Sequence, residues 1–181
     1  MKKYILIGLV VGLIFVSCNP NQKEIGEVES LLALIEDSEK SLLSVDTSLV
    51  FEVKRQMDQD IFSINTSGDT LTRKDAFKLD DVFGSKKRLH TIMRNYPGFL
   101  HQIEFSKKQL NNLKKDLEKG LVTKEDFTSY YKAEQNEVME LNSQISKALA
   151  GLDLSVIKFK KDRPIVLEIL KKRKLNTATN E

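Results

Sequence analysis

The sequence predicts an all-α fold, a helical bundle built around a long antiparallel helical hairpin with a coiled-coil-like seam. The chain has 181 residues but only 8 glycines and 3 prolines, too few turn formers for a many-stranded β-protein. Hydrophobic residues make up 40% of the chain and charged residues 30%, which is apolar enough for a packed core. Along most of the chain, apolar residues recur three and four positions apart, the spacing that places them on one face of a helix.

The first 17 residues have the three parts of a secretory signal. Lys2 and Lys3 give a positive start, an apolar run extends from Tyr4 to Val16, and the small Ser17 precedes Cys18. A helix needs about 20 apolar residues to cross a bilayer. Because this run is shorter, a removable leader is favoured over a permanent transmembrane helix.

The segment Phe15-Val16-Ser17-Cys18 resembles the lipobox of bacterial lipoproteins, in which a small residue precedes the cysteine. Phe15 stands where that family usually has leucine. The resemblance implies cleavage before Cys18, attachment of a diacylglycerol to its thiol, and anchoring through acyl chains such as palmitate. It implies a signal peptide over residues 1–17 and a lipid-anchored tether over residues 18–23. A helical domain over residues 24–174 and a disordered tail over residues 175–181 are then expected from the pattern of the remaining sequence.

The residues after the cysteine bear on the destination. Asn19 stands where an aspartate would resemble an inner-membrane retention signal, so the resemblance implies the outer membrane of a Gram-negative bacterium. Gln22-Lys23-Glu24 looks like the short charged tether that sends some lipoproteins to the cell surface, and periplasmic and surface orientations both stay open. The alternative is an ordinary thiol at Cys18. Since this is the only cysteine, a disulfide framework and a thiolate metal site are excluded in either case.

Three helices are expected in the first part of the body. The first stripe, with Glu39 on the same row, comprises Ile25, Val28, Leu32, Ile35 and Leu42. After a break at residues 44–48, the second comprises Val50, Val53, Met57, Ile61 and Ile64. Residues 65–69 read as a turn, after which Thr72 can cap a short helix at Asp75. This helix contains Phe77, Leu79, Val82 and Phe83, and Gly84-Ser85 ends or weakens it.

The clearest pattern is a pair of long stripes that predicts the hairpin. The first stripe comprises Leu89, Ile92, Tyr96, Phe99, Ile103, Ser106, Leu110, Leu113 and Leu117. The second comprises Phe127, Tyr131, Glu134, Val138, Leu141, Ile145 and Ala148. Between them, Gly120 can close the first helix in the left-handed conformation. Thr123 can cap the amide of Asp126, while Val122 and Phe127 stand at the positions of a hydrophobic staple.

Two prolines are expected to interrupt helices. Pro97 removes a backbone hydrogen bond inside the first long stripe, so we expect a kink or a break there. Near the end of the chain, Asp162 can cap a helix and Pro164 can open it, before a frayed polar tail from Leu175 to Glu181. The stretch from Lys158 to Lys174 is strongly basic. It could lie on anionic lipid or bind an acidic glycan, but a packed terminal helix with a solvated positive end is favoured.

Few residues suggest chemistry. Ser106 and Glu134 are polar interruptions of the two apolar stripes, and the hairpin register would place Glu134 near Gln109 and Leu110, within reach of Lys107 or Lys108. A register-setting polar pair or a solvated edge is favoured over a functional carboxylate. His101 and Glu104 could donate two metal ligands, but nothing supplies the others, so no metal site is expected. Asp69-Thr70-Leu71 looks like a short O-glycosylation acceptor.

The sequence therefore predicts a non-enzymatic scaffold or protein-interaction module, without cofactor, metal or catalytic residues. The leader carries two lysines and no acidic residue, so the remaining chain has a formal charge of +1 instead of +3, and nucleic acid is not an expected partner. The expected partners are the membrane, through a lipid on Cys18, and an envelope protein, with homo-oligomerisation through unpaired stripes also open. The alternatives are inhibition of an envelope enzyme, or carriage of a small apolar ligand in a cavity lined by Phe77, Phe83, Phe99 and Phe127.

Overall fold

The computed structural model describes residues 21–67 and 70–179, and this part of the chain contains six helices and no strand. The predicted all-α class is confirmed. Cys18, the predicted leader and Asp69 lie outside the described residues. The helices are α1 (Gln22–Leu43), α2 (Thr47–Thr66), α3 (Arg73–Phe83), α4 (Lys86–Glu118), α5 (Lys124–Leu149) and α6 (Leu152–Thr179).

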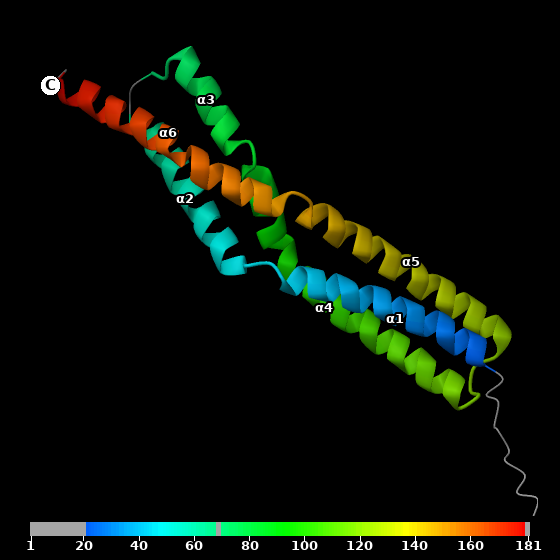
Figure 1. Ribbon diagram of the computed structural model, residues 1–181. Coiled ribbons are helices and arrows are strands. Elements are labelled where there is room, and N and C mark those ends of the chain that lie inside the picture. Colours follow the sequence, from blue (N-terminus) through cyan, green and yellow to red (C-terminus); the bar gives the residue numbers. More distant parts are fainter. Residues whose placement is uncertain (1–20, 68–69, 180–181) are drawn as a thin grey trace, which may run out of the picture.

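One half of the molecule, here called the arm, consists of α1, α5 and the second part of α4, and each of these helices packs on the other two (Figure 1). The sequence predicts a two-helix hairpin at this place, and the structure adds α1 as a third helix. Because Asn21 bonds to the Leu117 carbonyl (2.9 Å) while Glu39 pairs with Lys107 (2.7 Å), α1 runs antiparallel to α4.

The other half, here called the head, consists of α2, α3, α6 and the first part of α4. The buried carboxylate of Asp60 on α2 accepts two hydrogen bonds from the guanidinium of Arg163 on α6, at 2.9 and 3.2 Å. The side chain of Lys158 bonds to Asp81 of α3 at 2.8 Å. These ion pairs fix α6 against α2 and α3, at the edges of an apolar core.

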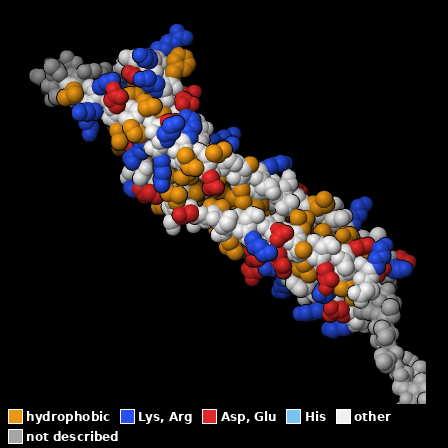
Figure 2. All heavy atoms as spheres, viewed as in Figure 1, with side chains coloured by type: hydrophobic (Ala, Val, Ile, Leu, Met, Phe, Trp, Pro, Cys, Tyr) orange, Lys and Arg blue, Asp and Glu red, His pale blue; other side chains and the backbone are white. Residues whose placement is uncertain are grey.

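The molecule is elongated, and its described ends lie far apart. Figure 1 shows the first turn of α1 at one end, beside the α4–α5 turn, and the end of α6 at the opposite end, in the head. The hydrogen bond from Asn21 to Leu117 places the first described residue at the tip of the arm. In Figure 2, hydrophobic side chains reach the surface where the arm and the head meet, between charged ones.

The apolar stripes form the core, with small shifts in two helices. All residues of the first long stripe are buried apart from the partly buried Tyr96. In α1 the buried residue is Leu31, and the predicted Leu32 is only partly buried. In α2 the buried residue is Asp60, which pairs with Arg163, and the predicted Ile61 beside it is only partly buried. A three-residue step instead of a four-residue step rotates the buried face toward the neighbouring helix.

The predicted helix ends are confirmed at the points with the strongest local signals. The hydroxyls of Thr72 and Thr123 accept hydrogen bonds from the amides of Asp75 and Asp126, at 3.1 and 3.2 Å. Gly120 has a φ of 67°, in the left-handed region that favours glycine. These local sequences therefore define where α3 and α5 begin and where α4 ends.

The expected effects of the two prolines are only partly observed. Pro97 lies inside α4, which is not broken, although its first part runs in a different direction from the arm (Figure 1). The prediction that Pro164 opens a new helix is wrong, because α6 runs through it without a break. Buried Phe159 before it and Val166 after it pack into one core, and this packing outweighs the lost hydrogen bond.

The ends of the helical domain also differ from the expected ones. Gln22 and Lys23, expected in the tether, form the first turn of α1. Leu175, expected to open the polar tail, lies inside α6, which continues to Thr179.

Candidate binding groove

A groove with a volume of about 480 Å³ lies between α4 and α5 in the arm. Helix α4 contributes one wall, and α5 contributes the other wall with its two carboxylates. Its lining residues are His101, Gln102, Phe105, Ser106, Glu134, Glu137 and Leu141. None of them belongs to α1, and the α4 lysines that pair with α1, Lys107 and Lys114, are not among them. The groove is therefore separate from the ion pairs that join α1 to α4.

The groove follows from the two polar interruptions of the apolar stripes. Ser106 occupies a buried position of α4 with 6% of its surface exposed, where the neighbouring turns have Ile103 and Leu110. Its small side chain leaves space that a large apolar residue would fill. On α5, Glu134 stands where the stripe calls for an apolar residue, one turn before Val138. Both interruptions thus open the same space between the helices.

The groove has an acidic and an apolar side. Burial raises the pKa of Glu134 above its usual value of 4.5, and the nearby charge of Glu137 raises it further. Loss of hydration disfavours the charged form of a carboxyl group, as does a second negative charge. Phe105, with 57% of its surface exposed, and the buried Leu141 supply apolar surface beside these carboxylates. A cation with an apolar stem would relieve the unfavourable charge of Glu134 and cover this apolar surface.

The predicted partner of Glu134 is wrong. Lys107 pairs with Glu39 of α1 at 2.7 Å, and Lys108 is exposed. The reason is that the arm has three helices, and Glu39, on the stripe of α1, offers Lys107 a closer carboxylate. Glu134 instead lines the groove together with Ser106 and His101.

Of the two residues weighed as metal ligands, only one lines the groove. His101 lines the groove, whereas Glu104 is exposed and does not. Within residues 21–67 and 70–179, no three histidine, cysteine or acidic side chains are grouped so as to hold a metal ion.

Sequence reasoning missed Phe105 and Glu137. Glu137 follows Glu134 by three positions, so both lie on one side of α5, and this spacing is a usable signal. Phe105 lies off the apolar stripe of α4 and directly before Ser106. A large aromatic residue beside a small buried one is a second usable signal.

The four phenylalanines considered for an apolar cavity belong to separate contacts. Phe83 packs on Phe159 with ring centroids 6.4 Å apart, and Phe127 stacks on Tyr131 at 5.3 Å. Phe77 is exposed and Phe99 is buried in α4. The structure does not gather them around one cavity.

The basic stretch from Lys158 to Lys174 is part of α6, and several of its cations are paired within the protein. Lys158 bonds to Asp162 as well as to Asp81, and Lys172 pairs with Glu168 at 2.7 Å. Val166 and Ile169 of the same stretch are buried. A packed helix with a positive outer surface accounts for this composition. The glycosylation motif has its first residue outside the described part of the chain.

The fold and the groove define the class of this protein as an elongated all-α bundle with an open acidic groove. No protein-family model matches the chain, and no curated protein or solved structure shows significant similarity to it. None of the helices in the described ranges is both long and apolar enough to cross a membrane.

Proposed function

We propose that this chain is a lipid-anchored envelope protein without catalytic activity that binds a basic segment of a partner protein in the α4–α5 groove. The binding proposal rests on the two carboxylates of Glu134 and Glu137, which line the groove beside the exposed apolar surface of Phe105. The anchor rests on the lipobox-like residues that end at Cys18, and the outer membrane is the proposed location.

The position of the first described residue supports the anchoring geometry. Asn21 lies at the tip of the arm, bonded to Leu117, only three positions after Cys18. A lipid at Cys18 would hold the arm tip close to the membrane and leave the head at the far end of the molecule. The groove, on the arm, would then lie between the membrane surface and the head.

The groove chemistry fits a lysine or arginine side chain of the partner. The methylene stem of such a side chain can lie on Phe105 and Leu141 while its charge meets Glu134 and Glu137. A cation near the face of Phe105 gains a further attraction from the aromatic ring. Neighbouring apolar residues of the partner would cover the exposed remainder of the phenylalanine.

Binding of a basic amphipathic peptide tests this proposal. The probe is a fluorescent peptide of alternating lysine and leucine, measured by anisotropy against the chain starting at residue 19. Replacing Glu134 and Glu137 with glutamine removes two charge-assisted contacts, and we expect the affinity to fall by about tenfold, which is about 1.4 kcal/mol.

The matched control changes two carboxylates outside the groove. The double variant E104Q/E140Q removes the same charge from the exposed faces of α4 and α5, and we expect it to bind like the unmodified chain. An equal loss in both double variants would mean that only the net charge attracts the peptide. That result, or an absence of binding by the unmodified chain, contradicts the proposed site.

A further inference from the structure

The outward face of α2 in the head carries a pattern that is complementary to its own reverse: an aromatic residue meets an aromatic one, and a basic residue meets an acidic one. Phe51 and Phe62 are both exposed, with 56% and 68% of their surface accessible, and they lie eleven positions apart on the same side of the helix. Between them lie a basic residue, Arg55, and an acidic one, Asp58. The positions 51 and 62 and the positions 55 and 58 share one midpoint, between residues 56 and 57.

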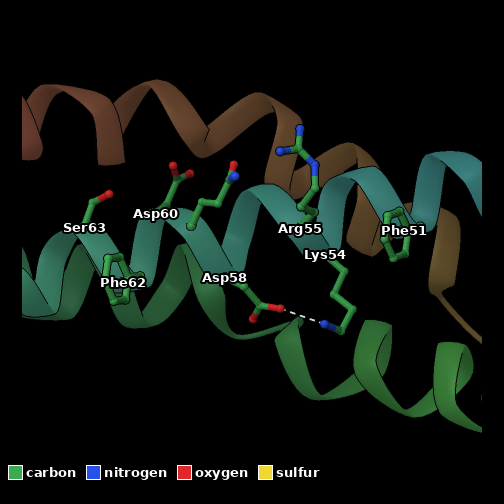
Figure 3. Close-up of a pocket in the computed structure, with 8 residues that line it drawn as sticks. Phe51, Lys54, Arg55, Asp58, Asp60, Phe62 and Ser63 are labelled. Atoms are coloured by element: carbon green, nitrogen blue, oxygen red, sulfur yellow. Dashed lines mark hydrogen bonds and ion pairs between the residues drawn. The ribbon is translucent and has the colours of Figure 1, made fainter.

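These residues border a shallow hollow of about 660 Å³ on α2. Figure 3 shows Phe51 and Phe62 toward opposite ends of the helix segment, with Asp58 between them. The ribbons of α6 and α4 run beside this segment. Both aromatic rings are exposed on one face of α2, so their apolar surface is available for burial against another molecule. The face is therefore open to another molecule.

We propose that this face binds a second copy of the chain, with the two α2 helices packed antiparallel about a twofold axis between residues 56 and 57. In this register Phe51 of one copy lies against Phe62 of the other, twice. Arg55 of each copy lies within reach of Asp58 of the other. A twofold interface requires a surface that is complementary to itself, and this pattern meets that requirement in both shape and charge.

The charges of the face are held in place before association. Arg55 donates two hydrogen bonds to Glu52, at 2.9 and 2.7 Å, and Asp58 pairs with Lys54 at 2.7 Å and Lys86 at 3.4 Å. These bonds orient Arg55 and Asp58 without burying them, since their side chains remain 47% and 40% exposed. Less side-chain freedom is therefore lost when the second copy binds.

The contact of one helix face is small, so we expect a weak dimer with a dissociation constant on the order of 10–100 µM. Sedimentation of the chain starting at residue 19, which contains every described residue, measures it. The mass should rise from monomer toward dimer over this range. The double variant F51A/F62A should remain monomeric with unchanged helix content and melting temperature, because both side chains are exposed.

Phe77 provides the control, since it is an equally exposed phenylalanine of the head, on α3, with 65% of its surface accessible. The variant F77A should dimerise like the unmodified chain. A monomer at every concentration, a dimer that survives F51A/F62A, or an equal loss in F77A would overturn the proposal.

Disulfide trapping tests the register. The chain from residue 19 has no cysteine of its own, so thiols can be introduced singly. The antiparallel register predicts that F51C mixed with F62C forms a covalent heterodimer under mild oxidation, and that either variant alone forms far less. Crosslinking of F51C with itself as fast as with F62C would contradict this arrangement.

Discussion

Glu134 is the residue on which the groove depends most, because it is a partly buried carboxylate in a groove whose lining includes no lysine or arginine. The sequence identifies it as an interruption of the stripe and favours either a polar pair or a solvated edge. The polar pair with Lys107 is wrong, since Lys107 pairs with Glu39, and the solvated edge stays open. That pair required a two-helix arm, and the sequence carries no signal for which third helix would supply Glu39. The sequence identifies Ser106 and Glu134 individually, each as a polar interruption of its own apolar stripe. Their meeting in one groove depends on the packing register.

The raised pKa of Glu134 makes stability depend on pH. In the folded chain the pKa of Glu134 lies above its ordinary value of 4.5. The folded chain therefore binds this proton more tightly than the unfolded chain does. This group therefore makes the free energy of unfolding rise as pH falls through the raised pKa toward 4.5. We expect the variant E134Q to lose this dependence and to be at least as stable as the unmodified chain at pH 7, as measured by urea unfolding at several pH values.

The exposed Glu140 serves as the control, since E140Q removes one carboxylate of α5 and leaves Glu134 in place. The variant E134L should match or exceed the melting temperature of the unmodified chain, because leucine suits the apolar stripe. A large loss of stability in E134Q or E134L would show that the carboxylate is needed for folding.

Among the helices, the local sequence predicts a helix end correctly where a chemical signal marks it. It does not predict the end where tertiary packing decides whether the helix continues. The caps at Thr72 and Thr123 and the turn at Gly120 were predictable, because each satisfies backbone groups within a few residues. The sequence wrongly predicts a helix start at Pro164. Its cost is offset by the burial of residues on both sides, which no local rule includes.

Two glycines in the arm test how the local backbone conformation contributes to stability. Gly120 adopts a φ of 67°, while Gly26 lies inside α1 with open space where a side chain would be added. We expect G120A to lower the free energy of unfolding by about 1 kcal/mol, since alanine resists the left-handed conformation. G26A should raise it by about 0.5–1 kcal/mol through lower backbone entropy in the unfolded chain. Urea titration of both variants measures the difference, and a destabilised G26A would contradict the packing described for α1.

In the whole molecule, the bond between Asn21 and Leu117 places the first described residue at the tip of the arm. A lipid on Cys18 would therefore hold that tip near the membrane. In the proposed orientation the head, with the exposed phenylalanines of α2, is the distal part. This geometry could not be predicted from the stripes, because it depends on how α1 folds back along α4.

Intact-mass analysis of the polypeptide isolated from its native membrane tests the proposed lipid anchor. We expect a mature chain that begins at Cys18 and carries a diacylglycerol and further acyl chains on that residue. A variant with serine in place of Cys18 should lack the lipid and leave the membrane fraction. A native chain that still begins at Met1 and has a free thiol at Cys18 would contradict the anchor, the location and the orientation derived from them.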